Sequence, residues 1–203
     1  THPFTIHFAP TDVRVTTRLL ENRPQSAIFS SVHEGGHALY EQGIPLKFMR
    51  TALAGGATLA LHESQSRLWE NQVGRGLPFW THYYPILRAF FPEQLGNVSF
   101  EEVYCAINKV EPSFIRVEAD EVTYNFHIFI RFELEKALVT GDLAIEDVPD
   151  AWNARYEEYL GITPPNDALG CMQDIHWAQS MIGYFPTYAL GNLISAQLYD
   201  QLK

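Results

Sequence analysis

The chain has 203 residues, of which 14 are Lys or Arg and 24 are Asp or Glu, so its formal net charge is −10 at pH 7. This balance repels a phosphate backbone and excludes a typical nucleic-acid-binding protein. With 46% hydrophobic and 19% charged residues, the chain is too apolar for a disordered protein and is long enough to bury a core. It has no run of about 18 apolar residues and no secretory signal pattern, so we expect neither a membrane span nor secretion.

Cysteines and acidic residues refine this first description. Cys105 and Cys171 form no CxxC pair, so we expect two buried, unpaired thiols and a reducing, cytoplasmic setting. Of the 24 acidic residues, 14 lie between positions 101 and 160, where we expect a solvated helical surface. No repeat, low-complexity tract or Gly/Ser linker divides the chain, so residues 1–203 are expected to form a single core.

The spacing of apolar residues predicts the elements in chain order. Alternation with period two at 4–8 and 13–15 predicts two short strands. Helical spacing, capping patterns and terminating Gly or Pro residues predict the helices. The predicted helices cover 25–42, 58–73, a segment that starts at the Ser99–Glu102 capping box, 114–141, 151–160 and 186–202. The fold class is therefore mostly α, with a small β-sheet near the N-terminus.

The strongest chemical signal is the motif His33-Glu34-Gly35-Gly36-His37 inside the first predicted helix. Residues four apart lie on one helix face, so the two imidazoles can bind one tetrahedral ion, and zinc suits such donors. Glu34 lies about 100° further around the helix, where its carboxylate would act as a general base beside the attacking water. The glycine pair costs about 1 kcal/mol per residue against Ala, which suggests that a backbone or a substrate passes close by. The alternative is a structural histidine pair.

A catalytic zinc also needs a third protein ligand from another element. His62-Glu63-Ser64 on the second predicted helix supplies a carboxylate and an imidazole. We favour Glu63 over His62, because two His and one Glu form a common zinc set. The extended motif HExxHxxGxxH is absent, since Tyr40 and Gly43 occupy the positions of its Gly and third His. The alternative for Glu63 is a solvated helix charge.

Six segments resemble, in order, the signature blocks of the carboxypeptidase Taq family of metallocarboxypeptidases. They are His2-Pro3-Phe4, Asp12-Val13-Arg14-Val15-Thr16, His33-Glu34-Gly35-Gly36-His37, His62-Glu63-Ser64-Gln65, Ile115-Arg116-Val117-Glu118-Ala119-Asp120 and Gly170-Cys171-Met172-Gln173-Asp174-Ile175-His176-Trp177. The resemblance covers nearly the whole chain. It implies a helical, gluzincin-like catalytic core of a cytoplasmic enzyme that removes C-terminal residues from peptides with broad specificity. It also implies zinc or cobalt as the metal and a homodimer in the full-length form.

Family members are much longer than 203 residues, so we expect this chain to be a fragment or a truncated form. A carboxypeptidase must bind a free α-carboxylate, which an Arg guanidinium does through two hydrogen bonds. Arg116 is the first candidate and Arg14 the second. The alternative for Arg116 is an ion pair with Asp120, four residues on in the predicted helix. His2 would line the substrate cleft or cap the first strand, and Asp12 would orient a metal ligand.

The last signature block and the residues after it offer groups for the oxyanion. By analogy with related helical metallopeptidases, His176 and Tyr184 would bind the oxyanion and the substrate backbone. Tyr188 is the rival for the role of the phenol, and core packing is the alternative for both tyrosines. Asp174 would hold His176 in one tautomer.

Three alternatives to a complete carboxypeptidase remain. A zinc endopeptidase on the same scaffold would need no carboxylate-binding Arg. A catalytically incomplete remnant would bind metal without turnover. A non-enzymatic chain would carry the His-Glu-Gly-Gly-His motif by chance and use the acidic 101–160 surface to bind a protein. In the favoured interpretation the partners are peptides with a free C-terminus, and neither nucleic acid nor membrane.

Overall fold

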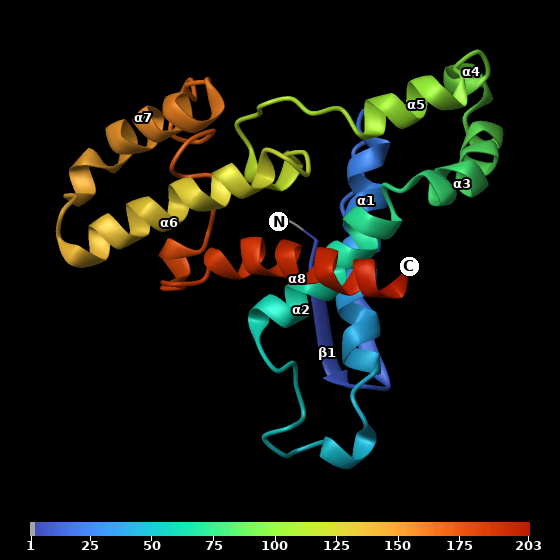
Figure 1. The fold of residues 1–203 in the computed structure, drawn as a ribbon, viewed down its shortest axis with the longest axis horizontal. Coiled ribbons are helices and arrows are strands. Elements are labelled where there is room, and N and C mark those ends of the chain that lie inside the picture. The colour runs from blue at the N-terminus through green and yellow to red at the C-terminus, as the bar shows by residue number, and fades with distance from the viewer. Residues whose placement is uncertain (1–2) are drawn as a thin grey trace. The chain divides into compact units, whose positions relative to one another are not determined.

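The computed structural model describes residues 3–203, so His2 lies outside the described residues. These residues form two compact units. The first comprises the described residues up to Lys109 together with Leu190–Lys203, and the second is Val110–Ala189 (Figure 1). That residues 1–203 act as a single catalytic core stays a prediction.

The first unit is built on a helix pair with a hairpin beside it. Strands β1 (Thr5–Ala9) and β2 (Asp12–Val15) pair antiparallel. Both strands contact α1 (Pro24–Gln42), which packs against α2 (Leu59–Arg67) (Figure 1). A π-helical segment, Leu68–Val73, continues α2. The predictions of two N-terminal strands and of helices over 25–42 and 58–73 are confirmed.

A glycine sets how closely α1 and α2 approach each other. A Cβ atom at Gly36 would lie 2.7 Å from the carbonyl oxygen of Gln65 and 2.7 Å from Cα of Ser66. At Gly35 a Cβ atom would meet nothing within 4 Å. The expectation that a backbone or a substrate passes close to the glycine pair is confirmed for Gly36, where the backbone of α2 does so. No backbone lies close to Gly35, where the alternative of a substrate stays a prediction.

The rest of the first unit is helical. The spacing of apolar residues predicted neither α3 (Leu77–Phe90) nor α4 (Pro92–Leu95), whose internal or leading prolines weaken the helical signal. The core of this unit forms where Phe29 of α1 packs against Trp80 and Tyr84 of α3. Helix α5 (Phe100–Ile107) begins at the predicted capping box, which is present in full.

The second unit is centred on α6 (Tyr124–Thr140) and α7 (Val148–Leu160), which pack against each other (Figure 1). The predicted helix over 114–141 is wrong in its first part. Residues Arg116–Glu118 form a short 3₁₀ turn, and the Asp120 carboxylate accepts hydrogen bonds from the backbone N–H groups of the two residues that follow Glu121. Such side-chain acceptors favour a turn before a helix over a continuous helix.

The last helix, α8 (Pro186–Leu202), confirms the prediction for 186–202 and runs from the second unit into the first. Its Gly191 lies in the first unit, where a Cβ atom would stand 2.8 Å from Cγ of Glu63. Both cysteines are free, as expected, but Cys105 is exposed and Cys171 only half-buried, so the expectation of two buried thiols is wrong. Within residues 3–203 no helix combines the length and apolarity that a membrane span requires.

Candidate metal centre

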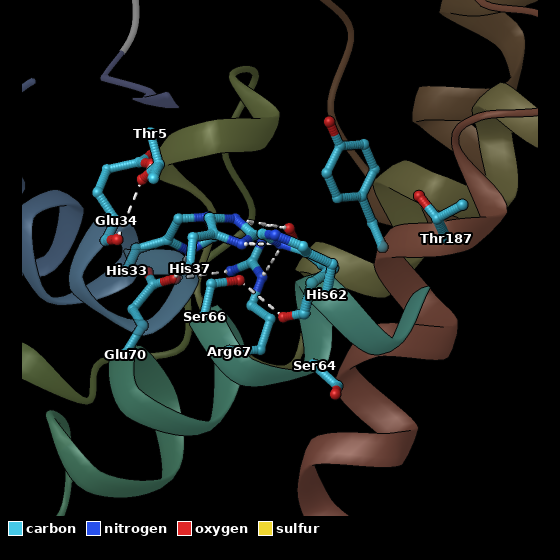
Figure 2. A network of polar contacts seen from close by, with 12 residues as sticks. Thr5, His33, Glu34, His37, His62, Ser64, Ser66, Arg67, Glu70 and Thr187 are labelled. Carbon is cyan, nitrogen blue, oxygen red and sulfur yellow. Dashed lines mark hydrogen bonds and ion pairs between the residues drawn. The ribbon is translucent and has the colours of Figure 1, made fainter. Parts of the chain in front are cut away.

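Three side chains of the first unit converge on one point, and Figure 2 shows two of them, His33 and His37, beside each other. His33 and His37 come from α1 and Glu63 comes from α2, and one ligand atom of each lies within 4.8 Å of the others. Oε2 of Glu63 is 3.3 Å from Nε2 of His37 and 3.9 Å from Nε2 of His33. Ligands about 2 Å from a tetrahedral zinc stand roughly 3.3 Å from one another. The three residues therefore fit a zinc-sized ion with little movement.

A carboxylate on the other ring nitrogen orients His33. Nδ1 of His33 lies 2.8 Å from Oε2 of Glu70, on the π-helical segment after α2. An ionised carboxylate only accepts, so Nδ1 carries the hydrogen and the lone pair of Nε2 is left for a metal. Arg67 donates from Nη1 to Glu70 at 3.1 Å and from Nε to Oε1 of Glu63 at 3.0 Å. Arg67 thus holds one oxygen of Glu63 and leaves Oε2 facing the imidazoles.

A chain of two hydrogen bonds orients His37. Nδ1 of His37 lies 2.6 Å from Nδ1 of His62, and Nε2 of His62 lies 2.6 Å from Oε1 of the buried Glu41. Because Glu41 accepts, His62 carries its hydrogen on Nε2 and accepts at Nδ1 from His37. The Nε2 lone pair of His37 is then left for a metal. His62, the alternative ligand, contacts His37 and lies outside the three-residue cluster found among the described residues.

Electrostatics keep the two site carboxylates ionised. Burial would raise the pKa of Glu63, but His33, His37 and Arg67 outweigh burial and hold that pKa well below its usual range. Burial is likewise outweighed at Glu70, where Arg67 and His33 lower the pKa to about 2. Burial would lower the pKa of His33, but the carboxylates of Glu63 and Glu70 raise it. Two ionised carboxylates with one Arg67 between them leave one negative charge that Arg67 does not balance, which favours a bound cation.

Glu34 is buried on α1, and its role as a general base stays a prediction. It follows His33 on α1, is buried with 7% of its surface exposed, and is not a member of the three-ligand cluster. Its Oε2 accepts a hydrogen bond of 2.6 Å from the Thr5 hydroxyl of β1 (Figure 2). One helix thus carries two imidazoles of the cluster and, next to the first of them, a buried carboxylate.

Comparison with known proteins places the chain in a family. All of residues 1–203 match the carboxypeptidase Taq (M32) metallopeptidases. The chain belongs to this family. It is 52% identical to thermostable carboxypeptidase 1 of Thermus thermophilus, over 100% of this chain and 39% of that protein. It is 49% identical to carboxypeptidase 1 of Bacillus subtilis, over 99% of this chain and 40% of that protein.

The fold is also similar to that of a solved carboxypeptidase structure. The M32 carboxypeptidase from Deinococcus radiodurans matches with a TM-score of 0.93 and 50% identity, over 98% of this chain and 40% of that one. The chain spans about 40% of the length of these relatives. The resemblance drawn from the six signature blocks and the mostly helical fold class are confirmed.

Arg116, in this M32 chain, has partners other than those expected. Its side chain is buried, and it donates from Nε and Nη2 to Oδ1 of Asp174 at 3.0 and 2.8 Å. Nη1 donates to the hydroxyl of Tyr124 at 2.9 Å. The alternative of an ion pair with Asp120 is wrong, because the two residues do not share a helix. That Arg116 binds a substrate carboxylate stays a prediction.

Arg14 and Asp12 pair with each other on β2. Arg14 donates from Nε and Nη2 to the two carboxylate oxygens of Asp12 at 2.8 and 2.9 Å, and both side chains are exposed. The expectation that Asp12 orients a metal ligand is therefore wrong. This pairing uses two of the three nitrogens of the Arg14 guanidinium. That Arg14 contacts the substrate stays a prediction.

Asp174 accepts hydrogen bonds from two arginines, and not from the expected histidine. Besides Arg116, it accepts from Nε of Arg131 at 2.6 Å. Its approach to Nδ1 of His176 is 3.9 Å, which is too long for a hydrogen bond. The expected bond from His176 to Asp174 is therefore wrong.

The three residues predicted to bind the oxyanion nevertheless form one cluster in the second unit. Nε2 of His176 lies 2.8 Å from the hydroxyl of Tyr188, and the ring of Tyr184 lies 5.3 Å from the imidazole. Tyr188 is thus the tyrosine that hydrogen-bonds His176, while Tyr184 packs against it. Their roles in catalysis stay predictions.

Sequence reasoning missed the side chains that hold the ligands and the base. Glu41 stands four residues after His37, and Arg67 stands four residues after Glu63. Helical spacing of four was an available signal for Arg67, which bonds Glu63, whereas Glu41 bonds His62 of α2 and its spacing from His37 did not indicate that contact. Thr5 carried no such signal, because its contact with Glu34 joins a strand to a helix.

Proposed function

We propose that this chain carries the zinc site of a metallocarboxypeptidase that removes C-terminal residues from peptides with a free C-terminus. The observation that carries the proposal is the convergence of His33, His37 and Glu63, with the buried Glu34 next to His33 in α1. Two imidazoles and one carboxylate favour zinc, and cobalt is the alternative metal. The relatives that bear the name carboxypeptidase support the activity. A cytoplasmic location and a homodimer of the full-length protein belong to the same proposal and depend on family resemblance.

In this mechanism the residues of the chain orient the reactants and move one proton. When bound, the metal would supply Lewis acidity toward the scissile carbonyl and make a water more acidic. Glu34 takes a proton from the attacking water and delivers it to the leaving amine. His33 and His37 present Nε2 because Glu70 and His62 occupy their Nδ1 atoms.

The oxyanion and the C-terminal carboxylate need donors of their own. His176, with Tyr188 or Tyr184, would donate hydrogen bonds to the developing oxyanion. Arg14 and Arg116 are the candidates for the carboxylate. The exposed Arg14 has one nitrogen beyond its pair with Asp12, whereas the buried Arg116 already bonds through all three nitrogens.

The test combines metal analysis with turnover on paired substrates. We would measure zinc by elemental analysis and follow hydrolysis of an N-blocked dipeptide with a free C-terminus and of its C-terminal amide. We expect zinc in the purified chain and cleavage of the free acid alone. Equal cleavage of both substrates would favour the endopeptidase, zinc without turnover would favour the remnant, and failure to bind zinc would overturn the proposal.

Variants assign the roles. Glu34→Gln should retain zinc and lose turnover by about 10²–10⁴-fold, while Glu21→Gln, an exposed glutamate before α1, should match the wild type. An active Glu34→Gln variant would contradict the general base. Arg14→Ala and Arg116→Ala should be compared on the free acid, and the variant with the larger rise in KM identifies the carboxylate-binding residue.

A further inference from the structure

The N-terminal hairpin carries two signature blocks but supplies no metal ligand within residues 3–203. Its strands contact α1, the helix that bears His33, Glu34 and His37. The hydroxyl of Thr5 contacts Glu34 on this helix, and the hydroxyl of Thr16 accepts a hydrogen bond from the N–H of Phe4 across the hairpin.

The hairpin is fixed at the position next to Thr5. The backbone N–H of Thr16 donates to the carbonyl of Phe4 at 2.9 Å, and the N–H of Phe4 donates to the hydroxyl of Thr16 at 2.9 Å. Thr5 then stands opposite Val15 in the antiparallel register. With a third bond of 3.3 Å from the Thr16 hydroxyl to the Phe4 carbonyl, three hydrogen bonds between positions 4 and 16 hold the backbone from which the Thr5 side chain extends.

Thr5 reaches from this fixed strand to the general base. Its Oγ1 lies 2.6 Å from Oε2 of Glu34 and 3.1 Å from the backbone carbonyl of the same residue. An ionised carboxylate has no hydrogen to donate, so the Thr5 hydroxyl is the donor. An O–H···O⁻ bond of this length is among the stronger hydrogen bonds in proteins. Thr5 is also β-branched, which restricts its χ1 angle.

One oxygen of Glu34 is thus held and the other remains for the proton. Among the described residues, Oε1 of Glu34 has no hydrogen-bond partner, while Oε2 has Thr5 (Figure 2). A glutamate side chain rotates about three bonds and, without a restraint, would sample several directions. A general base works only when it stays within hydrogen-bond reach of the water.

We propose that Thr5 is a positioning residue for Glu34: its hydroxyl fixes one carboxylate oxygen so that the other faces the attacking water. This inference rests on the proposed function, because it assigns Thr5 to the base of that reaction. It gives the first two signature blocks a common purpose, since the block around Thr16 holds the strand and the block around Phe4 brings Thr5 to α1.

The experiment compares three variants of the full chain. Thr5→Val removes the hydroxyl and keeps the shape, and Thr5→Ser restores the hydroxyl. Thr17→Val is the matched control, because the Thr17 hydroxyl also contacts α1, through Ser31 at 3.2 Å, and has no contact with Glu34. We expect Thr5→Val to lower kcat on the order of 10- to 100-fold with KM, zinc content and melting temperature near those of the wild type.

Thr5→Ser should recover most of the lost kcat, and Thr17→Val should match the wild type. Wild-type kcat in Thr5→Val, or equal losses in Thr5→Val and Thr5→Ser, would overturn the inference. Crystal structures of the zinc-loaded wild type and Thr5→Val decide it without turnover: we expect Glu34 to leave its wild-type rotamer, and an unmoved Glu34 carboxylate would contradict the proposal. A wild type that binds zinc but releases no C-terminal residue would refute the proposed function. The role of Thr5 would then be decided by the comparison of the two crystal structures alone.

Discussion

One added methyl group at Gly36 tests whether the contact between α1 and α2 sets the spacing of the metal ligands. In Gly36→Ala the new Cβ would stand 2.7 Å from the carbonyl oxygen of Gln65, 2.7 Å from Cα of Ser66 and 3.0 Å from its backbone nitrogen. Ordinary van der Waals contact begins at 3.4 Å. All three atoms belong to the backbone, so no side chain can rotate away. The two helices must separate by several tenths of an ångström.

This separation acts on stability and on the ligands at the same time. Overpacking of this kind costs about 1–3 kcal/mol, and the better helix propensity of Ala over Gly offsets about 1 kcal/mol of it. Glu63 lies on α2 and would move with Gln65 and Ser66, away from His33 and His37 on α1. Metal–ligand distances tolerate only about 0.2 Å, so we expect zinc affinity to fall on the order of 10–100-fold.

The neighbouring glycine provides the matched control. Gly35→Ala makes the same chemical change in the same helix, but its Cβ would meet nothing within 4 Å. We expect this variant to gain up to about 1 kcal/mol of stability and to bind zinc as the wild type does. Urea unfolding in the presence of a chelator measures the stability, and competition against a chromogenic chelator measures the zinc Kd. Equal zinc affinities of the Gly35→Ala and Gly36→Ala variants would refute the reasoning.

Two further changes test the buried charges. Asp174→Asn should cost about 3–5 kcal/mol in urea unfolding, because it leaves Arg116 and Arg131 buried without their counter-charge. Burial opposes ionisation of Asp174, but Arg131 and Arg116 lower its pKa to about 2, below the 3.8 of an ordinary aspartate. The ionised Asp174 therefore contributes about 2 kcal/mol to the free energy of unfolding above pH 4, and this contribution is lost as the pH falls toward 2. Between pH 4 and pH 2, the free energy of unfolding should fall less in Asp174→Asn than in the wild type. Glu41→Gln should weaken zinc binding on the order of tenfold through His62, and an unchanged zinc Kd would contradict the hydrogen-bond chain.

Local patterns in the sequence predicted those features that lie within a single helix or strand. The spacing of His33 and His37 follows from helical geometry alone, and the capping box at Ser99 was found because both of its partners lie within four residues. The start of α6 was predicted too early, because the hydrogen bonds of Asp120 end the preceding turn and apolar spacing does not record them. Helix α3 was missed because its prolines argue against a helix, although burial of Trp80 stabilises it.

Contacts between elements could not be predicted in the same way. Asp174 was expected to bond the histidine two residues on, whereas it bonds Arg116 and Arg131, which lie far away in the sequence. Two buried guanidinium groups need a counter-charge, and only the tertiary structure shows that a single carboxylate supplies it. The contact of Thr5 with Glu34 has the same origin, since nothing in either segment marks the other.

The six signature blocks form three structural pairs. The first two blocks close the hairpin through Phe4 and Thr16, and the next two bring the imidazoles of α1 to Glu63 of α2. The last two meet in the second unit, where the N–H of Arg116 donates to the side chain of Gln173 and its guanidinium bonds Asp174. This contact and the bond to Tyr124 use one hydrogen on each guanidinium nitrogen of Arg116, so two of its five N–H groups remain. A substrate carboxylate would meet a buried guanidinium already paired with Asp174, whereas Arg14 is exposed, so the search for the carboxylate-binding residue should begin with Arg14.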